Sequence, residues 1–156
     1  MSRRRTSDGF TLIELMVAVA IVGILVSVAL PTYRNFVIRS RLVAAINALS
    51  TMRAQMEQYY LDNRTYMSVS ATILTPCTAY AVTTTTSTMP FTVGCSAAGD
   101  VPTATTYRLR ATGAGVVAGA VYTVDQAGNM TTVSYPTSWG TVPANSCWLM
   151  RKGDSC

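Results

Sequence analysis

One uninterrupted apolar segment near the N-terminus constrains this sequence more than any other feature. The 21 residues from Phe10 to Leu30 contain a single ionisable side chain, Glu14, and Pro31 follows them. As an α-helix they would measure about 31 Å, close to the roughly 30 Å hydrocarbon core of a bilayer. The arginines at positions 3 to 5 precede the segment, and such basic residues stay in the cytoplasm. The segment therefore predicts one membrane-spanning helix.

Glu14 is the anomaly within this segment. An ionisable side chain in a membrane helix costs roughly 2.5 to 3.5 kcal/mol on insertion scales and normally has a partner. No basic side chain lies within helical reach on the apolar side. Cleavage after Gly9 would create a cation, because Phe10 would then carry a free α-amino group. That amine could pair with its own Glu14 or with the Glu14 of a neighbouring chain, which would set the axial register of a filament.

Two simpler interpretations of the segment leave Glu14 unexplained. A plain membrane anchor accounts for the apolar run alone. A secretory or twin-arginine signal would use Arg3 and Arg4 and a small-x-small cleavage site at Ser27-Val28-Ala29, but 21 residues is long for its apolar region. We therefore favour a processed membrane helix over both.

The contiguous residues Gly9-Phe10-Thr11-Leu12-Ile13-Glu14, after a short basic leader, resemble the type III signal of type IV prepilins. The resemblance implies that a prepilin peptidase cuts after Gly9 and methylates Phe10, and that Glu14 is the glutamate needed for assembly. Pro31 then matches the helix-kinking proline of the family, and the segment from Gly23 to Pro31 is the part that melts in assembled pili.

The resemblance also implies an organisation and a location. Residues 1–9 would be a leader that is removed, residues 10–33 a transmembrane and assembly helix, and residues 34–156 a globular pilin head. The subunit would cross the inner membrane once, with its head in the periplasm, and later form part of an extracellular pilus. Its partners would be the lipid bilayer, the prepilin peptidase, the inner-membrane assembly machinery and other pilin subunits.

The pattern after Pro31 is that of an amphipathic helix. Apolar residues recur at spacings of 3 and 4 on one face: Ile38, Leu42, Ala45, Leu49, Met52, Met56 and Tyr59. We expect this face to pack on the body of the head. A coiled-coil dimer is the alternative, but complementary charges do not repeat along its flanks. The whole helix would run from Phe10 to Leu61, and Asp62-Asn63 would end it.

Alternating apolar residues further along the chain predict short strands. Tyr80 to Thr84 and Phe91 to Gly94 are weak candidates in a Thr-rich connection. Three stronger ones follow, and the last two flank a Gly-containing hairpin turn: Thr106 to Thr112, Ala120 to Asp125 and Met130 to Tyr135. The expected fold is α+β, a pilin fold by resemblance. In it a long N-terminal helix, with its apolar half in the membrane, packs on a small antiparallel sheet with a disulfide-stapled C-terminal loop.

Four cysteines lie beyond the apolar segment, at Cys77, Cys95, Cys147 and Cys156. An even number in an exported head indicates two disulfides, and four cysteines allow three pairings. Pairing Cys77 with Cys95 and Cys147 with Cys156 closes the shortest loops, and we favour it while the other two stay open. Four buried free thiols in a cytosolic protein would conflict with the membrane-targeting N-terminus.

The composition argues against enzymatic chemistry. The chain has no histidine, which removes Ser-His-Asp and Cys-His catalysis and the commonest zinc ligand. It has no phosphate loop or paired-carboxylate site, and Asp100, Asp125 and Asp154 are too dispersed for a calcium site, so we interpret them as surface or turn residues. We expect no catalytic residue, metal or cofactor.

Several functions remain open within the filament interpretation. Major and minor pilins share these features, and Cys147-Trp148 leans towards a minor pilin of the PilE type; adhesion and twitching motility are compatible roles. Type II secretion pseudopilins share the N-terminal motif, but the commonest generally lacks the disulfide-bounded tail. A competence minor pilin that binds DNA is a further alternative. Four basic side chains would form a patch for DNA if the strand predicted for Thr106 to Thr112 lies close to the C-terminal tail: Arg108, Arg110, Arg151 and Lys152.

Overall fold

The computed structural model describes residues 10–143 and 146–156. The chain forms two units, Met1–Val37 and Ile38–Cys156. The helix α1, Leu12–Asn63, contributes to both of them. This division falls four residues later than the predicted boundary between positions 33 and 34, because burial of the helix begins only at Val37 and Ile38.

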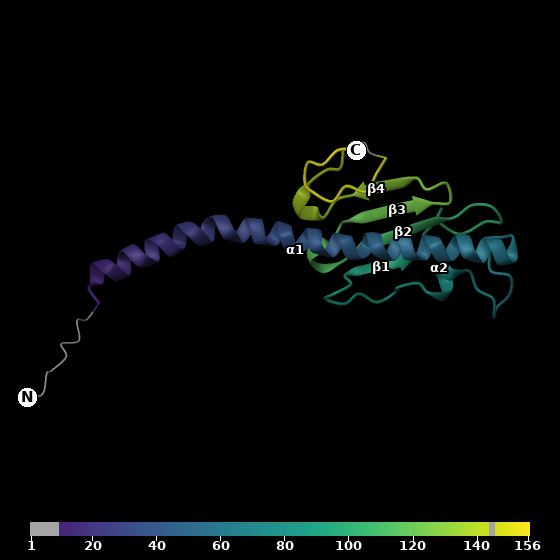
Figure 1. Ribbon diagram of the computed structural model, residues 1–156, viewed down its shortest axis with the longest axis horizontal. Coiled ribbons are helices and arrows are strands. Elements are labelled where there is room, and N and C mark those ends of the chain that lie inside the picture. Colours follow the sequence, from purple (N-terminus) through teal and green to yellow (C-terminus); the bar gives the residue numbers. More distant parts are fainter. Residues whose placement is uncertain (1–9, 144–145) are drawn as a thin grey trace, which may run out of the picture. The chain divides into compact units, whose positions relative to one another are not determined.

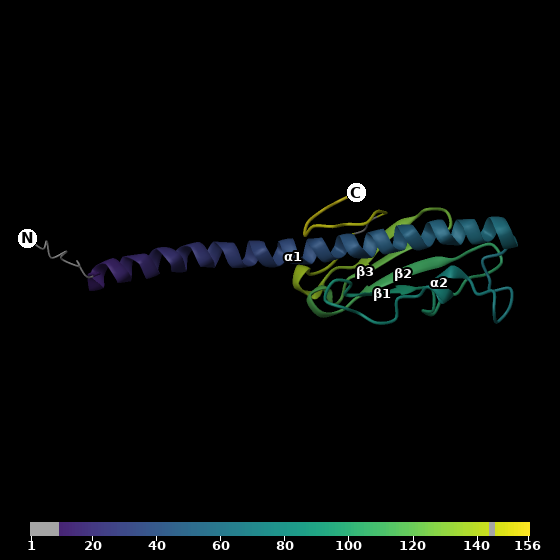
Figure 2. The same ribbon diagram turned by 60° about the horizontal axis from the view of Figure 1, so that its bottom comes forward.

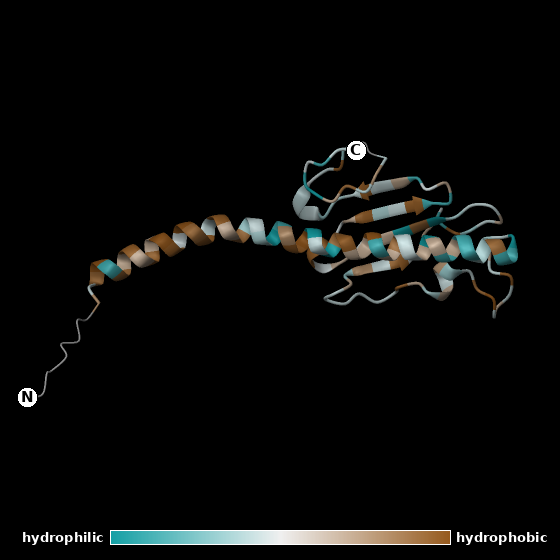
Figure 3. Cartoon of the chain, in the orientation of Figure 1, coloured by the Kyte–Doolittle hydropathy of each residue, from teal (hydrophilic) through white to brown (hydrophobic). Residues whose placement is uncertain are grey.

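In the first unit, α1 is an apolar helix with an exposed surface. Every residue from Phe10 to Phe36 is exposed, and Figure 3 draws most of this part of the helix in the colours of apolar residues. It is long and apolar enough to cross a membrane. Pro31 lies inside the helix, which continues through it without a break. The segment from Gly23 to Pro31 is therefore helical in the single subunit.

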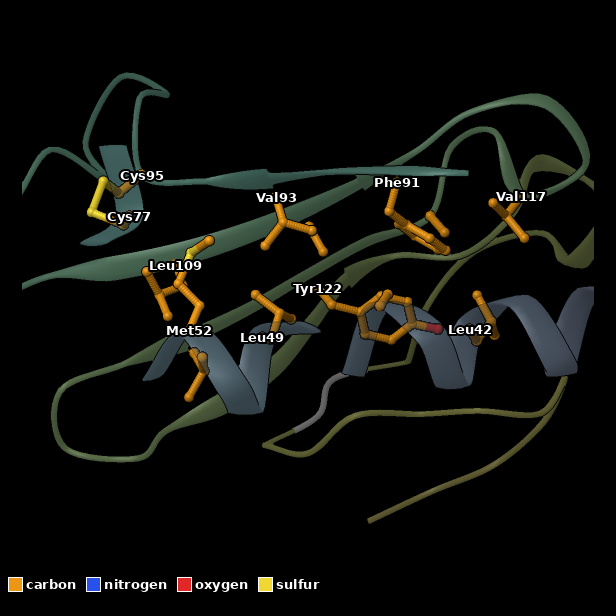
Figure 4. Packing of buried hydrophobic residues seen from close by; sticks show 14 of the residues in the cluster. Leu42, Leu49, Met52, Cys77, Phe91, Val93, Cys95, Leu109, Val117 and Tyr122 are labelled. Carbon is orange, nitrogen blue, oxygen red and sulfur yellow. A yellow bond between two sulfur atoms is a disulfide. The ribbon is translucent and has the colours of Figure 1, made fainter. Parts of the chain in front are cut away.

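In the second unit, one face of α1 is buried against a sheet. The seven apolar residues predicted for this face are the buried residues of the helix, from Ile38 to Tyr59. Figure 4 shows Leu42, Leu49 and Met52 of the helix in one cluster with Leu109 and Tyr122 of the strands. The predicted packing of this stripe on the head is confirmed, because a 3.6-residue repeat places these positions on one side.

The sheet has four antiparallel strands in the order β1-β2-β3-β4 (Figure 1). Each strand begins and ends within two residues of the predicted positions. The strands are β1, Phe91–Gly94, β2, Arg108–Gly113, β3, Val121–Asp125, and β4, Met130–Ser134. The helix lies on one side of the sheet, as Figure 2 shows. Leu109, Ala111 and Tyr122 point towards the helix, whereas Arg110, which lies between Leu109 and Ala111, faces outward. The α+β pilin fold expected from the sequence is confirmed.

The connection between α1 and β1 differs from expectation. The strand predicted for Tyr80 to Thr84 is wrong, because only Val82 pairs with the sheet, in a single bridge to Val93. A strand needs a continuous partner, and β1 is only four residues long. Just before it, Pro76–Ala79 form the short helix α2, with Pro76 in its first turn, where a missing backbone N–H is harmless.

Two disulfides and two short helices complete the head. Cys77 is bonded to Cys95, and Cys147 to Cys156, which is the pairing that closes the shortest loops. The 3₁₀ turns are η1, Gly115–Val117, and η2, Thr137–Trp139. Gly113 is required beside η1, since a Cβ atom there would lie 2.3 Å from the Val117 carbonyl oxygen.

Candidate filament and nucleic-acid interfaces

The start of α1 is fixed by a local hydrogen bond. Thr11 precedes the first helical residue, and its Oγ1 accepts a hydrogen bond from the backbone N–H of Glu14 at 3.3 Å. Thr-x-x-Glu is the sequence of a capping box, and a carboxylate in the first turn also interacts favourably with the helix dipole. Phe10 is 86% exposed and lies outside the helix. Gly9, the predicted cleavage position, lies outside the described residues.

Gly23 has no packing role within the subunit. A Cβ atom added there would meet nothing within 4 Å. Pro31 cannot donate a hydrogen bond to the preceding turn. The hydroxyls of Ser27, before it, and Thr32, after it, donate to the carbonyls of Ile24 and Val28. Residues 23–31 are therefore a helical stretch whose backbone is weakened by its sequence alone.

Arg108 and Arg110 lie on the outward face of β2, but a carboxylate engages both. The Arg110 guanidinium forms two hydrogen bonds to Asp100, one of them from Nη2 at 3.3 Å, and Arg108 Nη1 lies 3.9 Å from the same carboxylate. The Asp100 side chain is fully buried. Asp100 is a turn residue, as one of the two interpretations had it, since its backbone N–H donates to the Ala97 carbonyl at 2.9 Å. The surface interpretation was wrong, because the loop before β2 folds the Asp100 side chain back over these arginines.

A second carboxylate balances Arg108. Asp125 is directly opposite Arg108 in the β2–β3 pairing. Burial alone would raise the pKa of Asp125, but hydrogen bonds from Asn129 and Ala127 and the charge of Arg108 lower it below its ordinary value. Two arginines and two aspartates thus form a locally neutral group on this face. Asp125 also caps the β3–β4 turn, as expected of a turn residue.

Arg151 and Lys152 are exposed in the C-terminal tail. The tail packs on the side of the sheet that faces α1: the backbone N–H of Leu149 donates to Thr132 Oγ1 at 2.8 Å, and the Tyr122 hydroxyl donates to the Leu149 carbonyl at 2.8 Å. Arg108 and Arg110 face the opposite side. The four basic residues named from the sequence therefore form two separate pairs rather than one patch.

A polar network that joins the helix to the sheet was not predicted from the sequence. The Glu57 carboxylate accepts hydrogen bonds from the hydroxyls of Tyr66, at 3.0 Å, and Tyr107, at 2.7 Å. Burial, followed by the hydrogen bond to Glu57, raises the pKa of Tyr66 to about 12 and raises that of Tyr107 as well. Tyr107 is 50 positions from Glu57, so only the folded chain brings the two together.

The potential metal ligands are dispersed. Within residues 10–143 and 146–156, no three Cys, Asp or Glu side chains gather in a way that could hold a metal ion. All four cysteines are in disulfides.

Comparison with known proteins identifies the family. Residues 31–131, about two thirds of the chain, match the family model described as "Type IV minor pilin ComP, DNA uptake sequence receptor". The chain belongs to the type IV pilin family. In this pilin, residues 4–30 also match the model of the prokaryotic N-terminal methylation motif, which spans Gly9, Phe10 and Glu14. Type IV pilins are structural subunits, so the expectation of a non-enzymatic pilin is confirmed.

Similar curated proteins are fimbrial subunits. The pilin is 42% identical over 59 residues to the fimbrial protein EcpC of Eikenella corrodens, covering 38% of this chain and 39% of that protein. It is 47% identical over 57 residues to a probable minor fimbrial protein of Dichelobacter nodosus, covering 36% of each chain. It is 36% identical over 64 residues to a fimbrial protein of Pseudomonas aeruginosa, covering 41% and 42%. The chain thus spans about two fifths of the length of the curated relatives it matches.

Proposed function

We propose that this pilin is a minor subunit of a type IV pilus and that its head binds DNA for uptake. It would be cleaved after Gly9, methylated at Phe10 and assembled through α1. The match of residues 31–131 to the ComP family carries this proposal, because those residues include most of the head and the printed description of the family is a receptor for DNA uptake sequences.

The exposed apolar surface of α1 supports the filament part of the proposal. A helix with large exposed apolar side chains from Phe10 to Phe36 needs cover, which lipid can provide before assembly and neighbouring pilin helices can provide afterwards. The subunit would therefore lie first in the inner membrane and later in an extracellular pilus. Prepilin peptidase and the inner-membrane assembly machinery would act on it before it enters the pilus.

Assembly would change the environment of two features of α1. The free amine of a methylated Phe10 would neutralise a Glu14 carboxylate inside the apolar bundle, where an unpaired charge is costly. The helix between Gly23 and Pro31 would unwind as subunits pack, since its backbone is the weakest part of the segment. The helical state of residues 23–31 described above would then be that of the single subunit.

The charge distribution of the head supports DNA binding and indicates where phosphate would bind. Residues 34–156 contain nine Lys and Arg and five Asp and Glu, a difference of +4. The arginine pair on β2 is balanced by Asp100 and Asp125, so it adds little net charge. The pair Arg151 and Lys152 is exposed and held in place by the disulfide-closed tail. We therefore place the principal phosphate contacts on the tail, with Arg108 as a secondary contact.

The test is a salt titration of DNA binding by the soluble head, residues 34–156. Double substitution R151Q/K152Q should weaken binding and reduce the slope of log K against log salt by about 2, since each lost phosphate contact removes about one unit. The matched control is R108Q/R110Q, which removes the same charge and should have a smaller effect. Equal losses of DNA affinity in both variants would contradict the placement of the principal contacts on the tail. If the wild-type head does not bind DNA, the DNA role itself is contradicted.

Sequence preference is the second measurement. A receptor for uptake sequences should bind duplexes carrying such a sequence more tightly than scrambled duplexes at equal salt, because base contacts add to phosphate contacts. An equal affinity would reduce the proposal to a pilin with non-specific DNA affinity. Failure of both measurements would leave the filament part standing, since it depends on α1 alone.

A further inference from the structure

The apolar part of α1 ends in a cluster of aromatic and basic side chains. Tyr33 is 66% exposed and Phe36 is 69% exposed, and Arg34 lies exposed between them. Tyrosine at the end of an apolar span is typical of the membrane–water interface, where an amphipathic ring lies at the level of the headgroups. Arginine at the same place extends its charge towards lipid phosphate. We call Tyr33, Arg34 and Phe36 the interfacial belt.

Among the residues that the structure describes, no carboxylate forms an ion pair with the basic side chains here. Two more arginines, Arg39 and Arg41, follow the belt on the same helix, and the sequence has no acidic residue between Glu14 and Glu57. The ion pairs among residues 10–143 and 146–156 all involve Asp100 and the β2 arginines. Glu57 accepts hydrogen bonds from two tyrosines. An anion from outside the chain is the complementary partner.

The length of the helix fits a membrane between two charged positions. Glu14 and Arg34 are 20 residues apart, and the residues between them are uncharged. At 1.5 Å per residue this distance is about 30 Å, the thickness of a hydrocarbon core. Glu14 can therefore lie at one interface while Arg34 lies at the other. In this register the carboxylate is in contact with water before assembly, and it needs neutralisation only when the helix enters a filament.

We propose that the interfacial belt, with Arg39 and Arg41 after it, binds the phosphate headgroups of anionic phospholipids in the leaflet opposite the N-terminus and so fixes the depth of the subunit in the bilayer. Guanidinium groups suit phosphate because they donate hydrogen bonds in a planar fork. Each basic residue near an anionic surface changes partitioning by roughly five-fold. This inference goes beyond filament assembly and DNA binding and depends on neither.

The test uses the full chain reconstituted in vesicles of equal phosphatidylglycerol and phosphatidylcholine. Native mass spectrometry after gentle extraction counts the lipids that stay bound. We expect wild type to retain phosphatidylglycerol over phosphatidylcholine by at least about five-fold. The variant R34Q/R39Q/R41Q should retain the two lipids in nearly equal amounts. The single variant R34Q, at an exposed site, should lose part of the preference with no effect on the head.

The matched control R64Q/R151Q/K152Q removes the same charge from exposed positions elsewhere and should keep the preference. The proposal is overturned if wild type shows no preference, if the belt variant keeps it, or if the control loses as much as the belt variant. A belt variant that keeps the lipid preference but binds DNA more weakly would overturn the proposal and indicate that these arginines contact nucleic acid instead. Loss of DNA binding by the tail variant R151Q/K152Q alone would bear only on the proposed function.

Discussion

The hydroxyl of Tyr107 donates a hydrogen bond to the Glu57 carboxylate at 2.7 Å, although the two residues are 50 positions apart. Tyr66 donates to the other carboxylate oxygen and stacks edge-on against Tyr107. Tyr107 immediately precedes β2, and Glu57 lies near the C-terminal end of α1. One half-buried acceptor thus ties the end of the helix to the start of a central strand, and it does so from a helix position between two residues of the apolar stripe.

Replacing Glu57 with alanine should destabilise the head by about 1 to 3 kcal/mol, because two buried hydroxyls would lose their acceptor. The free energy of unfolding in urea, measured on residues 34–156, checks this. Glu57→Gln is the control: its amide oxygen still accepts one hydrogen bond, so the loss should be smaller. Equal stability of all three proteins would mean that water replaces the carboxylate without cost.

Stability should fall at alkaline pH because of the same network. Below pH 10 Tyr66 is neutral in both states, and between about 10 and 12 the unfolded chain loses the proton while the folded chain keeps it. The unfolded state then binds fewer protons, so the free energy of unfolding decreases as pH rises through this window. Urea midpoints at pH 8, 10 and 11.5 measure the decrease. Tyr66→Phe should show a shallower decrease, and an identical profile would refute the assignment.

Asp100 should affect stability and DNA affinity in opposite directions. Asp100→Ala removes a buried carboxylate that engages Arg110, at a cost of roughly 1.5 to 3 kcal/mol for hydrogen bonds to a charged group. It also releases two arginines and adds one positive charge, so DNA binding at low salt should become tighter. Thermal melting and filter binding measure the two effects. Weaker DNA binding by a folded variant would show that Asp100 positions the arginines for contact.

The two disulfides should differ in what their loss does. The Cys77–Cys95 bridge spans 18 positions, and removing it by double serine substitution should cost about 3 kcal/mol in loop entropy. The Cys147–Cys156 bridge spans nine, should cost slightly less, and should loosen the tail that carries the proposed phosphate contacts. DNA affinity should therefore fall only for the second pair. A fall for both pairs at a temperature where both are folded would contradict that placement.

Glu14→Ala should separate processing from assembly. The variant keeps the cleavage motif up to Ile13, so the chain should still begin at methylated Phe10. It should accumulate in the membrane and be strongly depleted from sheared filaments, because the α-amino group would have no carboxylate to neutralise it in the bundle. Mass spectrometry of both fractions measures this. A Glu14→Ala chain as abundant in sheared filaments as the wild type would contradict this role of the carboxylate.

The elements of this fold that depend on local periodicity could be predicted from the sequence. The stripe from Ile38 to Tyr59 is buried as expected, since the positions of a helix face follow from spacing alone. β1, Phe91–Gly94, has the predicted bounds. The strand predicted for Tyr80 to Thr84 failed because strand formation depends on an available partner, and that edge offers Val82 only one bridge.

The candidate sites were less accessible to sequence reasoning because they depend on long-range placement. The basic residues could be named from the sequence, but their partners could not. The sequence did not show that Asp100, in a loop ten positions earlier, neutralises Arg110. Nor could it show that the tail that carries Arg151 packs on the other side of the sheet. The Tyr107 and Glu57 contact had no local signal, since neither residue belongs to a motif.

The cap at Thr11 has a consequence for maturation. The hydrogen bond that starts α1 is made by Thr11 and Glu14, both of which lie after the proposed cleavage position. Helix nucleation is the costly step of helix formation, and here its signal is carried by the mature chain itself. Cleavage ahead of Phe10 would thus exchange a basic leader for a single amine while leaving the first helical turn in place. The subunit could enter the filament without having to refold its own beginning.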